Sequence, residues 1–320
     1  MATAPVGAAI IAAHFDRAIA NVWFKNLIAF KLTAPWTLTP GALEEQLSNR
    51  PLLACSGLAE RSQGWVPAQG DGALVCAQGK QSLIALGVET KILPSSVVKD
   101  VAQERAEAFA SRVGFEPGKK QLREIRAQVR DELLPKAFCK RQITRAWINP
   151  DDGWIMVDSA SHTRAEELTE LLRETLGTLA IEPLSTEQSP VSCMSQWLLS
   201  GRASDGFVLD QDCEMKSGGD DPSAVRFARH ALDGDDVRRH LKEGKSVTQL
   251  GLKWNDRVRL ILAEPGVLKR IRFDAMEQDR DEPDGQQNQS EQFDADFALM
   301  TGELSALFSA LIRALGGLKG

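Results

Sequence analysis

The order of apolar and polar positions along the chain predicts a mixture of strands and helices. Residues 22–30 form a mainly apolar run that is typical of a strand. Three shorter runs, with Gly and Asp between them, predict strands around 65–67, 73–76 and 82–86. A further strand pair is predicted at 144–148 and 154–158, because Asn149-Pro150-Asp151-Asp152-Gly153 between them has the composition of a turn.

Helical spacing of apolar residues predicts four helical regions. Thr39 is a suitable N-cap, and Pro40 a suitable first residue, for a helix with Leu43 and Leu47 on one face. A long helical region is expected from about 96 to 134, interrupted between Gly114 and Gly118. Apolar stripes predict two more helices. One spans 163–176, with the stripe Leu168, Leu171, Leu172 and Leu176. The other spans 297–315, with the stripe Leu299, Leu304, Leu307, Leu311 and Leu315.

From residue 181 the chain is more polar, and short apolar runs predict strands near 207–209, 225–228, 247–254 and 257–263. The last two runs are separated by Asn255-Asp256, which is typical of a tight hairpin turn. Residues 274–296 hold nine acidic residues, one arginine and a Gln/Asn-rich stretch, which predicts a solvated loop. These elements together predict the α+β fold class, with more than one domain for a chain of 320 residues.

Composition narrows the class of protein. Hydrophobic residues make up 43% and charged residues 26% of the chain, and no uncharged apolar run of about 18 residues could span a bilayer. The five cysteines are widely spaced and form no CxxC pair, so we expect buried thiols rather than disulfides or structural zinc, as in a reducing cytoplasm. Residues 1–22 lack a basic segment ahead of their apolar stretch, which predicts an N-terminal extension rather than a signal peptide.

The charge is strongly partitioned along the chain. Residues 119–145 contain nine basic and three acidic residues, a net charge of +6, in a chain whose total is −6. On a helix, Lys119, Arg123, Arg126 and Arg130 form one stripe beside an apolar stripe of Leu122, Ile125, Val129 and Leu133. Such a helix can pack by one face and present cations that follow phosphates without reading bases. A solvated helix face without a ligand is the alternative.

Signals for catalysis are weak. Gly244-Lys245-Ser246 ends like a phosphate-binding loop, but Arg239 stands where the first glycine of that motif belongs. The four histidines are dispersed, which does not indicate a metal pair. Asp151, Asp152 and Asp158 are the residues of a possible metal-dependent nuclease, although the first two also suit a hairpin turn.

Several stretches together resemble the recombination-associated protein RdgC family of proteobacteria, in the family's order and from residue 23 to about 317. They are Trp23-Phe24-Lys25-Asn26-Leu27, Gly64-Trp65-Val66-Pro67, Lys91-Ile92-Leu93-Pro94-Ser95, Leu133-Leu134-Pro135-Lys136-Ala137-Phe138, Trp154-Ile155-Met156-Val157-Asp158, Phe293-Asp294-Ala295-Asp296-Phe297 and Leu299-Met300-Thr301-Gly302-Glu303-Leu304. Residues 1–21 are additional to the family pattern, and Val22 is a possible alternative start.

The resemblance implies a ring-shaped homodimer whose positively charged hole admits double-stranded DNA. We expect no enzymatic activity, cofactor, metal, membrane contact or small-molecule substrate. The expected location is cytoplasmic and nucleoid-associated. The resemblance also implies functional antagonism of RecA by competition for DNA. The implied protomer has a central α/β body (23–95, 139–180 and 274–320), a helical tip (96–138) and a base domain (181–273). Tip-to-tip and base-to-base contacts would close the ring.

Candidate site residues follow from the charge pattern and the resemblance together. The candidates for DNA contact are Lys91, Lys99, Lys119, Arg123, Arg126, Arg130, Lys136, Lys140 and Arg141. The candidates for dimer contact are Phe138, which matches the family's hydrophobic finger, and Val225, Arg229 and His230 of the base. A protein-interaction scaffold of the recombination machinery remains open as another function, beside the nuclease.

Overall fold

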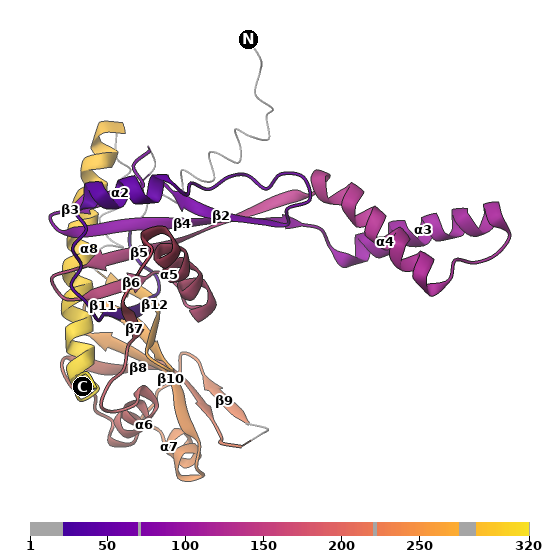
Figure 1. Ribbon diagram of the computed structural model, residues 1–320. Helices are drawn as coiled ribbons and strands as arrows, with labels where there is room; N and C mark the ends of the chain where they lie inside the picture. The colour runs from indigo at the N-terminus through magenta and orange to yellow at the C-terminus, as the bar shows by residue number, and fades with distance from the viewer. Residues whose placement is uncertain (1–21, 70–71, 220–222, 275–285, 320) are drawn as a thin grey trace.

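The computed structural model describes residues 22–69, 72–219, 223–274 and 286–319, and these contain two antiparallel sheets and seven α-helices (Figure 1). The predicted α+β class is confirmed. The predicted extension before residue 22 and the part of the predicted acidic loop at 275–285 lie outside the described residues.

A seven-stranded sheet has the order β2-β4-β5-β6-β1-β7, and β3 also pairs with β4. Its strands are β1 Ile28–Leu32, β2 Arg61–Val66, β3 Val75–Gln78, β4 Gln81–Ile92, β5 Phe138–Asn149, β6 Trp154–Val157 and β7 Ile181–Pro183. Helices α2 (Pro40–Ser48) and α5 (His162–Leu176) bury Leu43, Leu47, Leu168 and Leu172 in one apolar core with this sheet. Burial of these side chains, at about 25 cal/mol per Å2, stabilises the layer.

Local signals in this half are confirmed. Thr39 Oγ1 accepts a hydrogen bond from the Ala42 N–H at 3.3 Å, which caps α2 before Pro40. Strands β5 and β6 form the predicted hairpin, and Gly153 takes the left-handed φ of 75° that its turn requires. The predicted strand at 22–30 is partly wrong, because regular pairing begins only at Ile28 and Leu27 makes a single bridge to Leu268.

Strands β4 and β5 form a long arm that leaves the body (Figure 1). Each has 12 residues, and their pairing continues outward to Ile92 opposite Phe138. The arm ends in a helical hairpin of α3 (Ser95–Val113) and α4 (Lys119–Leu133), followed by a 3-10 turn at Leu134–Lys136. The predicted break between the two helices is confirmed, whereas β5 starts six residues before the predicted 144, since its outer part is polar.

The five-stranded sheet has the order β12-β11-β10-β8-β9. Its strands are β8 Phe207–Lys216, β9 Ala224–Phe227, β10 Ser246–Trp254, β11 Val258–Ala263 and β12 Val267–Phe273, with α6 Pro190–Ser200 and α7 Asp235–Lys242 beside them. The predicted β10–β11 hairpin is confirmed, and Asn255 and Asp256 adopt φ of 47° and 53° in its turn. Strand β12 and helices α6 and α7 have no counterpart in the sequence prediction.

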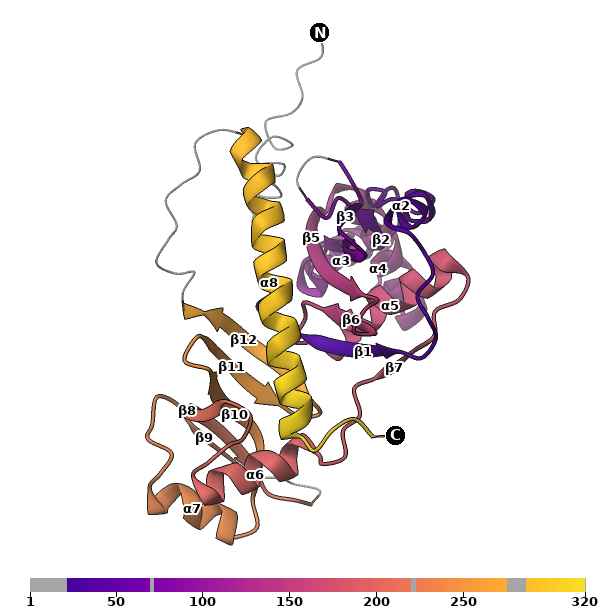
Figure 2. The same cartoon turned by 90° about the vertical axis from the view of Figure 1, so that its left-hand side faces the viewer.

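Helix α8 (Gln286–Ala314) runs along both sheets (Figure 2). It starts inside the predicted acidic loop, so that prediction is wrong for 286–296. Leu299 is also 56% exposed, whereas Phe297 and Met300 are buried, which corrects the predicted apolar stripe. Among the described residues, Glu291–Ala314 is long and apolar enough to cross a membrane by length and composition alone. Its buried apolar side chains instead share one core with both sheets.

The five cysteines are free thiols, as predicted. Cys76, Cys193 and Cys213 are buried, and burial raises the pKa of Cys213 to about 12. The expectation that every thiol is buried is wrong for Cys139, which is exposed on the arm, and for Cys55, which is half-buried.

Candidate nucleic-acid interface

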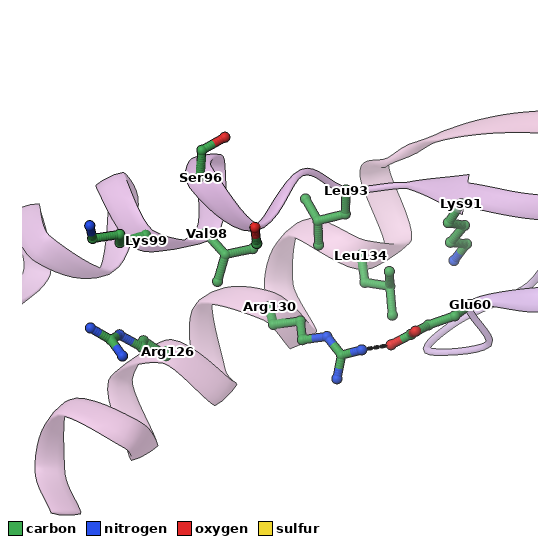
Figure 3. A pocket seen from close by; sticks show the side chains of 10 residues that line it. Glu60, Lys91, Leu93, Ser96, Val98, Lys99, Arg126, Arg130 and Leu134 are labelled. Atoms are coloured by element: carbon green, nitrogen blue, oxygen red, sulfur yellow. Dashed lines mark ion pairs between the residues drawn. The ribbon is translucent and has the colours of Figure 1, made fainter. Parts of the chain in front are cut away.

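A groove of about 770 Å3 lies where the arm meets the helical hairpin (Figure 3). Lys99 reaches it from α3 and Arg126 from α4, while Arg130 extends across it to Glu60. Lys91, Leu93 and Leu134 complete its inner end. The groove therefore gathers cations from two stretches of the chain, 91–99 and 126–130.

The amphipathic pattern of α4 positions its cations. Val129 is fully buried, and Leu122, Ile125 and Leu133 are half-buried on the same side. Lys119, Arg123, Arg126 and Arg130 are all exposed, so the predicted basic stripe does face solvent. Arg105 of α3 forms two hydrogen bonds with Glu132 of α4, at 2.9 and 2.6 Å, and this pair holds the two helices together.

The first turn of α3 adds to the positive potential of the groove. Ser95 and Ser96 line it, and the N-cap residue Pro94 makes no side-chain hydrogen bond to the free N–H groups of that turn. The N-terminus of a helix carries about half a positive charge. Backbone N–H groups, Lys99 and Arg126 thus offer an anion several donors in one place.

Two groove cations are held by the protein itself. Arg130 forms an ion pair with Glu60, and both side chains are about half exposed. Lys91 is 9% exposed and donates a hydrogen bond to the Gly57 carbonyl at 2.5 Å. As it lies here, Lys91 fastens the 57–60 loop to the arm and is buried, and its contact with DNA stays a prediction.

Arg141 is also engaged. Its Nε donates to Glu89 Oε2 at 2.5 Å, and the Cys55 N–H donates to Glu89 Oε1 at 2.8 Å. Burial by itself would raise the pKa of Glu89, but the hydrogen bonds from Arg141 and Cys55 bring that pKa below its ordinary value of 4.5. Glu89 is therefore ionised at neutral pH and anchors both Arg141 and the nearby loop.

The remaining predicted DNA contacts are spread along the arm and the hairpin. Lys119 and Arg123 lie on α4 toward the hairpin's free end, and Lys136 and Lys140 lie near the arm, all exposed. None of these four lines the groove. The structure thus brings together Lys99, Arg126 and Arg130 and leaves the others as a looser basic surface around them.

The predicted dimer contacts fall at two distant places (Figure 1). Phe138 is 86% exposed at the outer end of β5, opposite Ile92, which is 51% exposed. Val225 lies on edge strand β9, and Arg229 and His230 follow it. The His230 ring lies 5.3 Å from that of Phe227, and its Nε2 lies 3.6 Å from Asp236 Oδ2.

The three aspartates of the nuclease alternative have structural partners. Asp151 pairs with Lys80 at 3.0 Å, and Asp152 accepts a hydrogen bond from the Ser305 hydroxyl at 3.0 Å. Asp158 accepts the N–H groups of Lys25 and Asn26 at 3.1 and 2.9 Å. Burial raises its pKa despite these bonds and the Arg145 charge. In the part of the chain that the structure describes, no group of three or more His, Cys, Asp or Glu could hold a metal ion.

Sequence reasoning missed a second set of cations on the five-stranded sheet. Lys253, Arg259 and Arg272 lie on neighbouring strands β10, β11 and β12. The sequence does indicate these cations, because Arg259 and Arg272 each stand between two apolar residues, in Val258-Arg259-Leu260 and Ile271-Arg272-Phe273. This alternation is typical of a strand with one buried and one exposed face. It went unused because β12 was not predicted.

The fold and the groove together define a two-sheet α+β protein that concentrates cations around a projecting helical hairpin. Residues 22–318 match the family model described as "Putative exonuclease, RdgC". The chain belongs to the RdgC family, and the resemblance predicted from its motifs is confirmed.

Similar proteins cover nearly the same length. The chain is 43% identical over 300 residues to the recombination-associated protein RdgC of Dechloromonas aromatica (strain RCB), which is 92% of this chain and 98% of that protein. It is 42% identical over 297 residues to the protein of that name from Herminiimonas arsenicoxydans, at 92% and 98% coverage. These names associate the relatives with recombination and carry no enzyme name, whereas the family description names an exonuclease.

Proposed function

We propose that this protein binds double-stranded DNA through its phosphate backbone, without reading sequence, as a ring-shaped homodimer that encircles the duplex. Bound in this way at the nucleoid, it restrains RecA-dependent recombination by competing for DNA. The observation that carries the proposal is the groove in which Lys99, Arg126 and the first turn of α3 converge.

The groove suits phosphates better than base edges. Its donors are ammonium, guanidinium and backbone N–H groups, which bind phosphate oxygens and fix register without carrying sequence information. The surrounding cations extend the positive surface in both directions, with Lys119 and Arg123 along the helical hairpin and Lys136 and Lys140 toward the arm. A polyanion as long as duplex DNA can engage the groove and this surface at once.

Closure of the ring is assigned to the two exposed places described above. Phe138 and Ile92 form an exposed apolar pair at the outer end of the arm, where it meets the helical tip, and the tip of a second copy would cover both. Val225, Arg229 and His230 of the base domain are proposed for the second contact. Encirclement would keep the protein on DNA while individual phosphate contacts break.

The test is the salt dependence of DNA binding. Each phosphate contact contributes about −0.9 to the slope of log affinity against log salt concentration. Lys99→Gln with Arg126→Gln is therefore expected to flatten the slope by about 1.8. The matched control is Arg50→Gln with Arg173→Gln, which removes the same charge from ion pairs with Glu174 and Glu170 elsewhere on the protein.

A comparison of circular and linear DNA distinguishes encirclement from the alternative functions. Encirclement predicts that circular DNA stays bound after a high-salt challenge while linear DNA is lost from its ends. A slope unchanged by the double substitution would contradict the groove as the DNA site. Linear DNA shortened from its ends in the presence of magnesium would instead support the exonuclease of the family description. Binding of recombination proteins without DNA would support a scaffold.

A further inference from the structure

The five-stranded sheet carries a row of basic residues on the face away from α8. The strand register places Lys253 opposite Arg259, and Arg259 opposite Arg272, so one cation stands on each of β10, β11 and β12. Their neighbours in sequence, among them Leu252, Leu260 and Phe273, are buried in the core that contains α8. Since side chains alternate across a strand, the three cations point to the opposite, open face. We call this row the basic ladder.

The sheet sets the approximate spacing of the ladder. Neighbouring strands lie about 4.8 Å apart, so three strands place the cations across about 10 Å. Lys269 extends the basic surface along β12, because it pairs with Ile261, two residues beyond Arg259 on β11. The Arg259 side chain is 54% exposed, and Arg272 is exposed as well. Cations fixed on a sheet lose less conformational freedom on binding than cations on a mobile loop.

Two carboxylates partly neutralise the ladder. Asp274 Oδ2 lies 3.3 Å from Arg259 Nε and 3.9 Å from Lys253 Nζ, and Asp256 Oδ1 lies 3.1 Å from Lys253 Nζ. Against these two acids stand the three ladder cations, with Lys269 beside them. On β10, β11 and β12 these cations outnumber the two acids, and Asp274 occupies the position that a phosphate oxygen would take between two cations.

The open face also looks in a suitable direction. Helix α8 lies on the side of the five-stranded sheet away from the arm, so the opposite face looks toward the side to which β4 and β5 project (Figure 1). A duplex that lies on this side of the five-stranded sheet would therefore meet the ladder. Lysine and arginine side chains bind phosphate oxygens, and such contacts carry no sequence information.

We propose that the basic ladder of Lys253, Arg259 and Arg272 is a second contact site for the phosphate backbone of duplex DNA. The inference rests on the proposed function and adds to it a site on the base domain, on a different sheet from the arm. Charge complementarity carries the choice of DNA as the occupant. Asp274 acts there as an internal anion that phosphate displaces.

The test uses the full chain with Arg259→Gln and Arg272→Gln together. Two lost contacts should flatten the salt slope of duplex binding by about 1.8. Arg257→Gln with Arg313→Gln is the matched control, because the Arg257 side chain pairs with Glu303 of α8, and Arg313 lies on α8 and pairs with Asp205. The control should keep the wild-type slope. Lysine at both ladder positions should restore it, since a phosphate contact of this kind requires charge rather than a forked donor.

The outcomes separate this inference from the proposed function. If the wild-type protein fails to bind duplex DNA, the proposed function fails. If the wild type binds and the ladder variant keeps its slope and affinity, the ladder is overturned and the groove stands. Asp274→Asn is a second test that removes no arginine, and its expected effect on duplex affinity and on the salt slope is opposite to that of the ladder variant. It should tighten duplex binding and steepen the slope, and weaker binding by this variant would contradict the displacement of Asp274.

Discussion

The ion pair between Glu60 and Arg130 predicts that a single substitution raises the affinity of the protein for DNA. Glu60 holds Arg130 at the inner end of the groove and neutralises it. Glu60→Gln should release the guanidinium toward the phosphate that Lys99 and Arg126 approach. The variant should bind duplex DNA more tightly than the wild-type protein at low salt.

The size of the effect follows from one additional phosphate contact. One more contact steepens the salt slope by about 0.9, so a rise from about 50 to about 200 mM salt should reduce the variant's affinity roughly 3.5-fold more than that of the wild type. Folding stability should barely change. The side chains of Arg130 and Glu60 are 53% and 51% exposed, and exposed pairs contribute about 0.2–1 kcal/mol.

The assay is fluorescence anisotropy of a labelled duplex titrated with protein at several salt concentrations. Removal of any acid near DNA adds some long-range attraction, so Glu124→Gln on α4 serves as the charge-matched control. Arg130→Gln should abolish the extra effect of Glu60→Gln. If Glu60→Gln binds as Glu124→Gln does, or tightens binding equally without Arg130, then Arg130 is no phosphate ligand and the reasoning is refuted.

Three further predictions concern self-association and stability. Phe138→Ala should weaken dimerisation by at most about 1.5–3 kcal/mol, as measured by analytical sedimentation. It should not unfold the protein, because Phe138 is 86% exposed. Global unfolding of the variant would instead mean that Phe138 is a core residue. Asp158→Ala removes the acceptor of the Lys25 and Asn26 N–H groups and should lower the free energy of unfolding in urea by about 1–3 kcal/mol. Asp158→Asn keeps an oxygen in that place and should cost less, because burial raises the pKa of Asp158 and so disfavours its charged form; an equal loss in the two variants would contradict this. The pKa of Glu89 is lowered in the fold, so its stabilisation is present above pH 4.5 and is lost as pH falls through the folded pKa. The stability difference from Glu89→Gln should therefore shrink on acidification, and a constant difference would count against the Arg141 pair.

Local chemistry was sufficient to predict many elements. Thr39 with Pro40, the turn at 149–153 and Asn255-Asp256 each act over a few residues, and the structure contains the helix start and the two hairpins they indicate. The amphipathic pattern of α4 was readable for the same reason. Elements with weak local signals were missed or misplaced, among them the polar outer half of β5 and the first turns of α8.

The sequence by itself determined the α+β class, the family, the basic stripe of α4 and the order of the first-half elements. Only the tertiary structure decided which cations act together. It buried Lys91, paired Arg130 with Glu60 and brought Lys99 beside Arg126. It also aligned Lys253, Arg259 and Arg272 across three strands. The physical reason is that periodicity and capping depend on near neighbours in the chain, whereas the electrostatics of a site depend on burial and on partners that only folding brings within a few ångströms.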